Sequence, residues 1–222
     1  MRSKAAFTTR AALGALALTM AALGVRAESF GILTFIDVRA AAASEATALM
    51  HRTAHASSRE LLKEIARPDR FVLIEQADAV SPGSGTENGS LPEGLDRLLV
   101  APPDRRTHHK FEEAAAPRTI PEAAAARAVY LLAHVDIAPA NQPAAQEALR
   151  AVALKARTSA GNLRFEIWQQ TNRANHYHIV AAWKSVPDLE AFEASDASRD
   201  FRRIIAPLIG SLYDERRYRR AD

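Results

Sequence analysis

Apolar and polar positions follow the same order twice along the chain. Residues 30–38 and 129–137 have the pattern of strands, and each ends in an apolar–Asp–apolar triplet centred on Asp37 or Asp136. Segments 60–71 and 166–177 then align without a gap. The further elements predicted are helices over 44–59 and 143–158, strands at 72–76 and 178–183, a short helix in each half, and last strands at 107–111 and 212–218.

Each half therefore reads strand, helix, strand, strand, helix, strand, which is the βαββαβ ferredoxin-like unit of an α+β protein. We place the first unit at residues 28–113, with a Gly/Ser/Pro-rich insertion at 79–92. A linker at 114–127 contains two prolines, which argue against one continuous helix there. The second unit spans residues 128–222.

Strand alternation gives residues 129–137 two different faces. The odd-numbered positions are all apolar, which predicts packing under the helices. The even-numbered positions include Tyr130, His134 and Asp136, so we expect His134 to lie in an enclosed interior. In residues 175–183 both faces carry apolar side chains, and the pattern alone leaves open whether Trp183 or His178 points inward.

Residues 1–27 have the features of a secretory signal. A charged start with Arg2, Lys4 and Arg10 precedes an apolar stretch at 11–25, and small residues suit cleavage after Ala27. We therefore expect a periplasmic or secreted protein with no membrane segment after cleavage. A retained membrane anchor is the alternative, although the apolar stretch is shorter than the roughly 20 residues of a typical span.

The composition of the chain argues against several kinds of partner and metal site. The chain carries 29 Lys and Arg against 26 Asp and Glu, but residues 1–27 hold four of the basic residues and no acidic one. The near-neutral remainder gives no reason to expect nucleic acid or an anionic membrane as a partner. The absence of cysteine excludes disulfides, thiol catalysis and Cys-ligated metals. His51 and His55 lie four apart without an evident third ligand, and His108 and His109 point to opposite sides of a strand, so no metal site is predicted.

The second half resembles a known family over about ninety residues. The segments that carry the likeness are VYLLAHVDI (129–137), RTSAGNLRFE (157–166), NHYHIVAAWKS (175–185), LEAF (189–192) and YDERRY (213–218). They resemble the antibiotic biosynthesis monooxygenase (ABM) domain, in its quinol monooxygenase-like form. The first half matches more faintly, through RPDRF (67–71) and LIE (73–75), and is predicted to be a degenerate copy.

Because ABM proteins are dimeric α/β-barrels, the resemblance implies that the two units pack as one intrachain pseudo-dimeric barrel. Dimerisation of the whole chain stays open. The chain departs from the family at Ala181 and Phe192, where members often carry Glu and His, and the first half has Ala77 in place of Trp183. We therefore expect an enclosed cavity in the second half only, lined by His134, Tyr177 and Trp183, with the Trp183 face pointing into the barrel.

The resemblance implies cofactor-independent oxidation of a small aromatic substrate, a quinol or polyphenol, by dioxygen. Such chemistry needs a base near neutral pH, donors that fix the ring, and a dry aromatic wall. The candidate catalytic residues are His134, His178 as a reserve base, and Trp183. The candidate substrate-binding residues are Tyr130, Trp168, Asn175 and Tyr177. No Gly-rich dinucleotide fingerprint follows a strand, so no cofactor is predicted.

Plainer interpretations stand beside these. A strand histidine is commonly a hydrogen-bonded structural residue, and Trp183 suits a core position. The arginines at 216–220 fit a solvated end strand. At the level of function, the alternatives are a non-catalytic periplasmic binding or structural module on the same fold and, more weakly, a heme-binding or heme-degrading protein.

Overall fold

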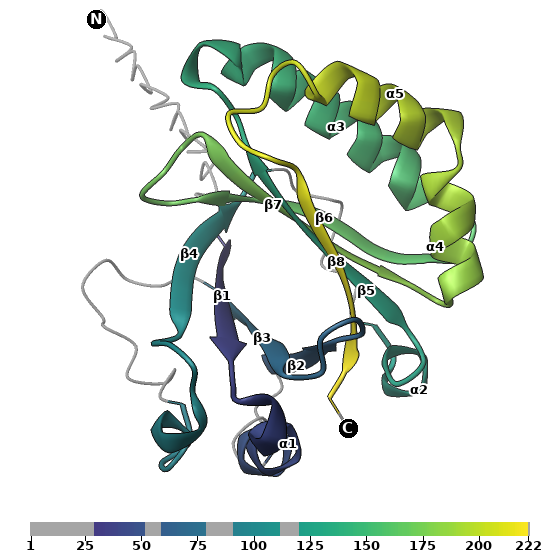
Figure 1. Cartoon of the computed structure of the whole chain (residues 1–222). Coiled ribbons are helices and arrows are strands. Elements are labelled where there is room, and N and C mark those ends of the chain that lie inside the picture. The colour runs from purple at the N-terminus through teal and green to yellow at the C-terminus, as the bar shows by residue number, and fades with distance from the viewer. Residues whose placement is uncertain (1–28, 52–58, 79–90, 112–119, 222) are drawn as a thin grey trace, which may run out of the picture.

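Eight strands close into one barrel in the order β1-β3-β2-β8-β5-β7-β6-β4 (Figure 1). The computed structural model describes residues 29–51, 59–78, 91–111 and 120–221. All neighbouring strands are antiparallel. The strands are β1(Ser29–Asp37), β2(Arg59–Glu64), β3(Arg70–Asp78), β4(Asp104–Lys110), β5(Val129–Asp136), β6(Asn162–Gln170), β7(His176–Trp183) and β8(Asp214–Arg220). The helices are α1(Ala43–His51), α2(Glu122–Ala125), α3(Gln142–Thr158), α4(Val186–Glu193) and α5(Asp196–Ile205), with 3-10 turns η1(Ala40–Ala42), η3(Asp96–Leu98) and η4(Pro139–Asn141).

The two halves build their sheets in the same order. The first half contributes β4-β1-β3-β2 and the second contributes β8-β5-β7-β6. The sheets join at their edges, where β8 pairs with β2 and β4 pairs with β6. Each junction removes a sheet edge that a separate unit would leave unpaired. The chain is thus an α+β protein of two ferredoxin-like βαββαβ units, packed as a pseudo-dimeric α/β-barrel, which confirms the predicted fold.

Helices cover the outer faces of the two sheets unequally. In Figure 1, α3, α4 and α5 lie together against the second sheet, and α1 lies at the opposite end of the molecule beside the first. The apolar stripe of α3, which includes Leu149 and Val152, packs on the odd-numbered face of β5. A second apolar cluster joins α1 to the first sheet, and a third fills part of the barrel interior.

Some elements differ from the sequence-based predictions. The helix before β4 is only the single turn η3. The helix predicted over 44–59 is described as α1 as far as His51, its residues 52–58 lie outside the described residues, and Arg59 already belongs to β2. The interpretation of residues 216–220 as a solvated end strand is wrong. β8 is paired on both sides and Tyr218 is buried, because barrel closure turns the edge strand of each sheet into an internal one.

Several predictions fall outside the described residues. They concern the signal segment 1–27, His55, nearly all of the insertion at 79–92 and the first part of the linker at 114–127. Within the described ranges, no helix combines the length and apolar character needed to cross a bilayer.

Candidate functional site

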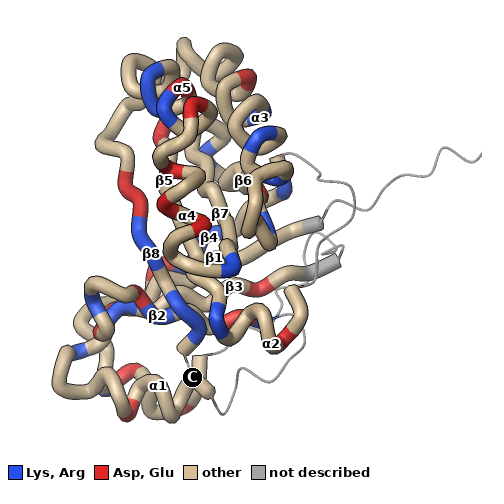
Figure 2. Tube along the Cα trace, turned by 90° about the vertical axis from the view of Figure 1, so that its right-hand side faces the viewer, with Lys and Arg blue, Asp and Glu red and all other residues tan. Residues whose placement is uncertain are grey.

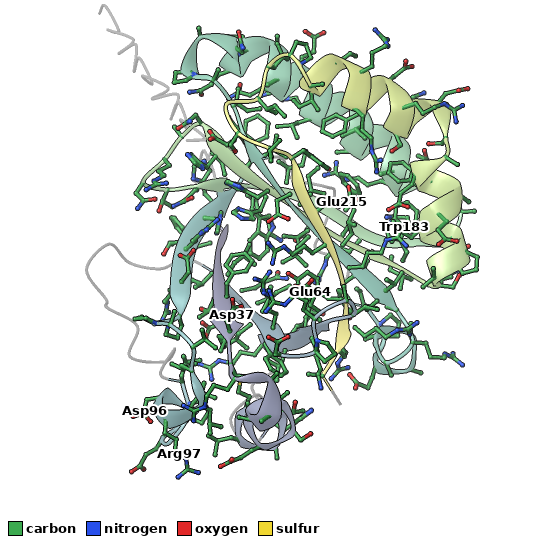
Figure 3. All side chains as sticks on the ribbon, viewed as in Figure 1. Asp37, Glu64, Asp96, Arg97, Trp183 and Glu215 are labelled. Atoms are coloured by element: carbon green, nitrogen blue, oxygen red, sulfur yellow. The ribbon has the colours of Figure 1, made fainter. Side chains whose placement is uncertain are left out.

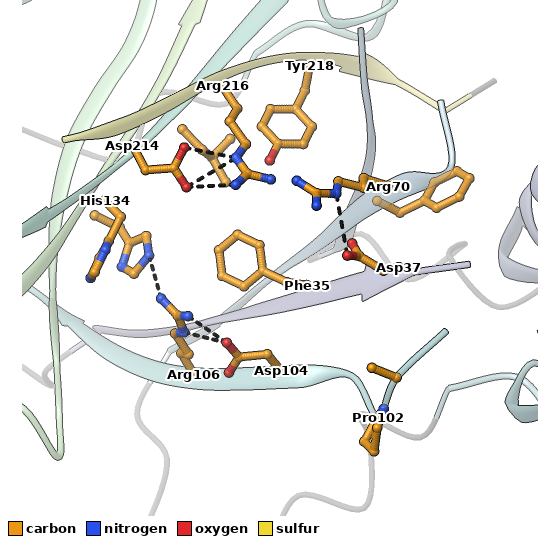
Figure 4. Close-up of a pocket in the computed structure, with 14 residues that line it drawn as sticks. Phe35, Asp37, Arg70, Pro102, Asp104, Arg106, His134, Asp214, Arg216 and Tyr218 are labelled. Atoms are coloured by element: carbon orange, nitrogen blue, oxygen red, sulfur yellow. Dashed lines mark hydrogen bonds and ion pairs between the residues drawn. The ribbon is translucent and has the colours of Figure 1, made fainter. Parts of the chain in front are cut away.

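Side chains from both halves line a cavity of about 350 Å³ at one end of the barrel (Figure 4). They come from six strands and from the segment that leads into β4, and they include Phe35, Arg70, Arg106, His134, His178 and Arg216. This volume lies within the range of small-molecule pockets, roughly 300–1,000 Å³. The cavity is therefore the candidate site.

Strand alternation turns His134 and His178 into the barrel. On β5 the odd-numbered residues pack under the helices, whereas Leu132 and His134 line the cavity, which confirms the predicted orientation of this strand. On β7 the even-numbered face is the inner one, with His178 in the cavity wall. His134 and His178 are cross-strand partners, and their ring centroids lie 4.9 Å apart.

Four histidines form a continuous row across β4, β7 and β5, which we call the imidazole row. His108 Nε2 and His178 Nδ1 are 3.0 Å apart, and His134 Nε2 and His176 Nδ1 are also 3.0 Å apart. His178 and His134 connect the two pairs through their ring contact. The row runs from the fully buried His108 to His176, whose side chain is 15% exposed. His176 Nε2 lies 3.5 Å from Oδ1 of Asp136.

The polar partners of the row determine where the protons lie. Arg106 Nη1 is 3.4 Å from His178 Nε2, and a guanidinium only donates, so neutral His178 carries its proton on Nδ1 and donates to His108. At the other end, the Asp136 carboxylate favours a proton on His176 Nε2. His176 Nδ1 then accepts from His134 Nε2. This arrangement leaves the lone pair of His134 on Nδ1.

Burial lowers the pKa of every histidine in the row. Desolvation is the main cause, and it lowers the pKa of His108 to about 4 and that of His178 well below the usual value. The pKa of His134 is lowered by burial and then by the positive charge of Arg106, while Asp136 and Asp214 act in the opposite direction. The pKa of His176 is lowered mainly by burial. All four imidazoles are therefore neutral near pH 7, the form that accepts a proton.

Three guanidinium groups reach the cavity, each with a carboxylate partner. The nitrogen–oxygen distances are 2.6 Å for Arg106–Asp104, 2.9 Å for Arg216–Asp214 and 3.4 Å for Arg70–Asp37. In Figure 4, Arg70 and Arg216 point toward one another, and Arg106 approaches the histidines from the opposite wall. Figure 2 shows the acidic start of β8 followed directly by its basic segment. These pairs surround the cavity with donors that are available to an anionic or phenolic ligand.

The second half carries imidazoles where the first half carries other side chains. In the β1–β3 register Asp37 pairs with Arg70, and in the β5–β7 register Asp136 pairs with His176. By the same registers, the pair His134 and His178 corresponds to Phe35 and Val72 in the first half. The two halves thus make different contributions to one shared cavity, rather than one cavity each. The expectation of a separate cavity confined to the second half is wrong.

Tyr177 and Trp183 lie on the outer face of the second sheet. Figure 3 shows Trp183 beside α4. Trp183 stacks on Phe192 of α4, with ring centroids 4.8 Å apart, and Gln146 of α3 donates to the Tyr177 hydroxyl over 2.9 Å. The prediction that the Trp183 face points into the barrel is therefore wrong. A pocket between this sheet and its helices has a volume of only about 20 Å³, which is room for about one water molecule and far too little for an aromatic substrate.

The other predicted binding residues do not line the cavity. Tyr130 and Trp168 face the barrel interior, where the guanidinium of Arg164 lies over the Tyr130 ring and the Trp168 indole donates to Glu166 over 3.0 Å. Asn175 donates to Oδ1 of Asp136 over 3.0 Å. Asn175 therefore supports Asp136 from outside the cavity.

The sequence patterns did not predict the contributions of the first half. Phe35 and Arg106 line the cavity, and His108 completes the imidazole row. One sequence signal could have indicated the arginines. Asp-x-Arg occurs at 104–106 and again at 214–216, at the start of the last strand of each unit.

Comparison with known proteins agrees with this architecture. The sequence profile of the antibiotic biosynthesis monooxygenase family matches residues 128–204. The second half of the chain contains an ABM domain. This ABM half supplies His134, His176 and His178, which are three of the four members of the imidazole row. No curated protein matches the chain in sequence.

Solved structures share the fold over both halves. A candidate monooxygenase from Lactobacillus acidophilus NCFM has a TM-score of 0.64 at 10% identity, with 88% of this chain and 95% of that chain covered. A candidate monooxygenase from Fusobacterium nucleatum subsp. nucleatum has a TM-score of 0.68 at 7% identity, with 88% and 94% covered. An anthrone oxidase-like protein has a TM-score of 0.66 at 9% identity, with 87% and 91% covered. At these identities the likeness concerns the fold alone. The structural match covers both halves of the barrel, whereas the family profile matches only the second half.

Proposed function

We propose that the protein is a cofactor-independent monooxygenase that oxidises a quinol or polyphenol with dioxygen in the barrel cavity. The observation that carries this proposal is a neutral histidine, His134, in the wall of a cavity of about 350 Å³. The ABM domain of the same half supports the reaction class. The reaction begins with transfer of a phenolic proton to Nδ1 of His134.

The cavity walls suit an aromatic ring that becomes anionic. Phe35 and Tyr218 provide aromatic surface. Arg106 and Arg216 provide donors whose positive charge favours a phenolate over the neutral phenol. A phenol of pKa about 10 is mostly protonated at neutral pH, so a base and nearby cations together make deprotonation accessible.

Deprotonation makes the substrate itself the reductant. A hydroquinone anion passes electrons to dioxygen, one oxygen atom forms a bond to ring carbon, and the other leaves as water. A hydroquinone plus dioxygen gives a hydroxyquinone plus water, which balances without a further reductant. What the chain supplies is the base, orientation of the ring, and exclusion of bulk water.

Oxygen consumption with menadiol tests the proposal. We expect enzyme-dependent uptake above autoxidation, and a product that carries one atom of ¹⁸O from labelled dioxygen. No uptake with menadiol or with a panel of hydroquinones and polyphenols would overturn it. Binding of these compounds without uptake would instead favour the binding module, and breakdown of added hemin would favour heme degradation.

The proposal also places the protein outside the cytoplasm, on the basis of the charged and apolar pattern of residues 1–27. Expression of the full chain with fractionation of the cells tests this point. We expect a shortened protein in the periplasm or medium, beginning at Glu28. Retention of the intact chain in the cytoplasm or in the membrane would contradict export.

A further inference from the structure

Asp136 and His176 lie behind His134 and outside the cavity lining. His176 Nδ1 is 3.0 Å from His134 Nε2, and His176 Nε2 is 3.5 Å from the Asp136 carboxylate. A carboxylate, an imidazole and a second imidazole thus lie in sequence and end at the cavity wall. We propose that Asp136 and His176 are positioning residues that hold His134 in the tautomer with its Nδ1 lone pair free. This inference rests on the proposed role of His134 as the base.

Neighbouring groups hold the carboxylate in place. Asn175 donates its amide hydrogen to Oδ1 of Asp136 and also to the carbonyl of Ile137, both over 3.0 Å. The backbone amide of Gly210 donates to the Asp136 carbonyl over 2.7 Å. These contacts tie the end of β5 to the turn before β7 and to the segment before β8. These contacts therefore hold the Asp136 carboxylate beside His176, 3.5 Å from its Nε2.

The first half shows what this arrangement adds. Its equivalent carboxylate, Asp37, pairs with Arg70, and the residue equivalent to His134 is Phe35. A guanidinium cannot accept a hydrogen bond, so it cannot transmit the effect of a carboxylate to a third group. Among the residues that the structure describes, those of the second half alone combine a carboxylate with an imidazole that accepts on one side and donates on the other.

The charged and titratable groups around His134 act in both directions. Arg106 of β4, together with His176 and His178 of β7, disfavours a positive charge on His134. Asp136 of its own strand and Asp214 of β8 favour it. When His134 accepts a substrate proton, the Asp136 carboxylate stabilises the resulting imidazolium through His176. The same logic applies wherever a carboxylate orients a catalytic histidine.

Nitrogen-15 NMR of labelled protein tests the tautomer without any substrate. We expect His134 in the wild type to carry its proton on Nε2 at pH 7.5. Asp136→Asn keeps the oxygen that accepts from Asn175 but removes the charge, so it should give a mixture of tautomers, as should His176→Phe. Asp200→Asn, which removes a surface carboxylate of α5, is the matched control. A proton on Nδ1 in the wild type, or no change in both variants, would overturn the inference.

The pH profile of menadiol oxidation supplies a functional readout. Asp136→Asn should lower kcat by at least about tenfold with little change in KM, since the wrong tautomer removes the base but not the binding surface. Loss of the negative charge lowers the pKa of His134, so the rising limb of the profile should move to lower pH. If Asp136→Asn does not fold, His176→Gln tests the same contact. An unchanged kcat and pH profile in the folded variant would overturn the positioning role. A wild type that is inactive on every quinol would overturn the proposed function instead, and the NMR result would then decide by itself whether Asp136 and His176 set the tautomer of His134.

Discussion

Trp183 and Phe192 stack with their ring centroids 4.8 Å apart and their planes at 26°. Trp183 ends β7 and Phe192 lies on α4, so this contact ties the second sheet to its helical cover. Both side chains are buried, and little open volume remains around them. The aromatic residue that the family resemblance assigned to the site therefore acts as part of the core.

Removal of the Phe192 ring should destabilise the protein without abolishing catalysis. Phe192→Ala leaves a cavity against Trp183 and should cost about 3–5 kcal/mol in the free energy of unfolding. Urea unfolding measures this cost, and Ile204→Ala on the partly exposed face of α5 is the control, expected within about 0.5 kcal/mol of wild type. The folded fraction should still oxidise menadiol. Loss of turnover with unchanged stability would place the active site under the helices instead.

His134 should account for most of the rate. His134→Ala should reduce menadiol turnover by roughly 10²–10⁴, the usual contribution of a positioned acid–base group. The strand should survive the change, because the odd-numbered face of β5 keeps its apolar contacts. In the wild type the rate should rise with pH through a pKa below the ordinary histidine value, since burial lowers the pKa of His134. Steady-state oxygen uptake between pH 4.5 and pH 8 measures both effects.

His178→Ala is the comparison for that experiment. Both of its ring nitrogens have partners, Arg106 on one side and His108 on the other. Removal of the ring leaves buried polar groups unpaired, which should cost about 1–3 kcal/mol of stability. We expect a smaller effect on rate than on stability. The reverse pattern for the two variants would make His178 the base.

The buried histidines should make stability fall in acid. Burial lowers the pKa of His108 to about 4 in the folded protein, whereas the unfolded chain takes up this proton below about pH 6.5. Stability from this group is therefore complete above pH 6.5 and is lost as the pH falls toward 4. His108 alone should contribute a loss of about 2 kcal/mol between pH 7.5 and pH 5.

Urea unfolding at pH 7.5 and pH 5 measures that loss. His108→Gln, which cannot titrate, should lose less stability between the two pH values than the wild type does, whatever its stability at pH 7.5. His109→Gln is the control on the same strand, because His109 contacts Gln169 rather than the imidazole row. An equal pH dependence in wild type and His108→Gln would show that His108 is not held neutral.

Much of the fold could be predicted because each half repeats one order of elements. The apolar–Asp–apolar triplets located β1 and β5, and the all-apolar odd face of β5 identified its helix-facing side. The faces of β7 could not be separated in this way, since Ile179 and Val180 are both buried on opposite sides of the strand. The solvated interpretation of β8 failed for a different reason. Arg216 lines the cavity whereas Arg217 faces outward to Glu193, and only barrel closure makes that difference.

The candidate site was only partly accessible to sequence reasoning. His134 could be named because strand alternation placed it on the mixed face of β5 and because histidine has the intrinsic pKa of a base near neutral pH, with His178 as the reserve. Phe35 and Arg106 could not, because they belong to the half with the fainter family likeness and reach the cavity only through the pairing of β1 with β4 and the closure of β4 onto β6. A site shared between the two repeats depends on barrel closure, and the local sequence pattern of a single strand does not predict that closure.

Arg216 and Arg217 offer a matched pair for testing the cavity. They are neighbours on β8, but Arg216 lines the cavity beside Asp214, whereas Arg217 faces outward to Glu193 of α4. If the substrate binds as a phenolate, Arg216→Gln should weaken binding of a redox-inert phenolic acid by roughly 10- to 100-fold, the value of about 1.5–3 kcal/mol for a hydrogen bond to a charged group. Arg217→Gln should leave binding unchanged and affect stability alone. Calorimetric titration of the wild type and both variants measures the difference, and wild-type affinity in Arg216→Gln would show that Arg216 does not contact the ligand.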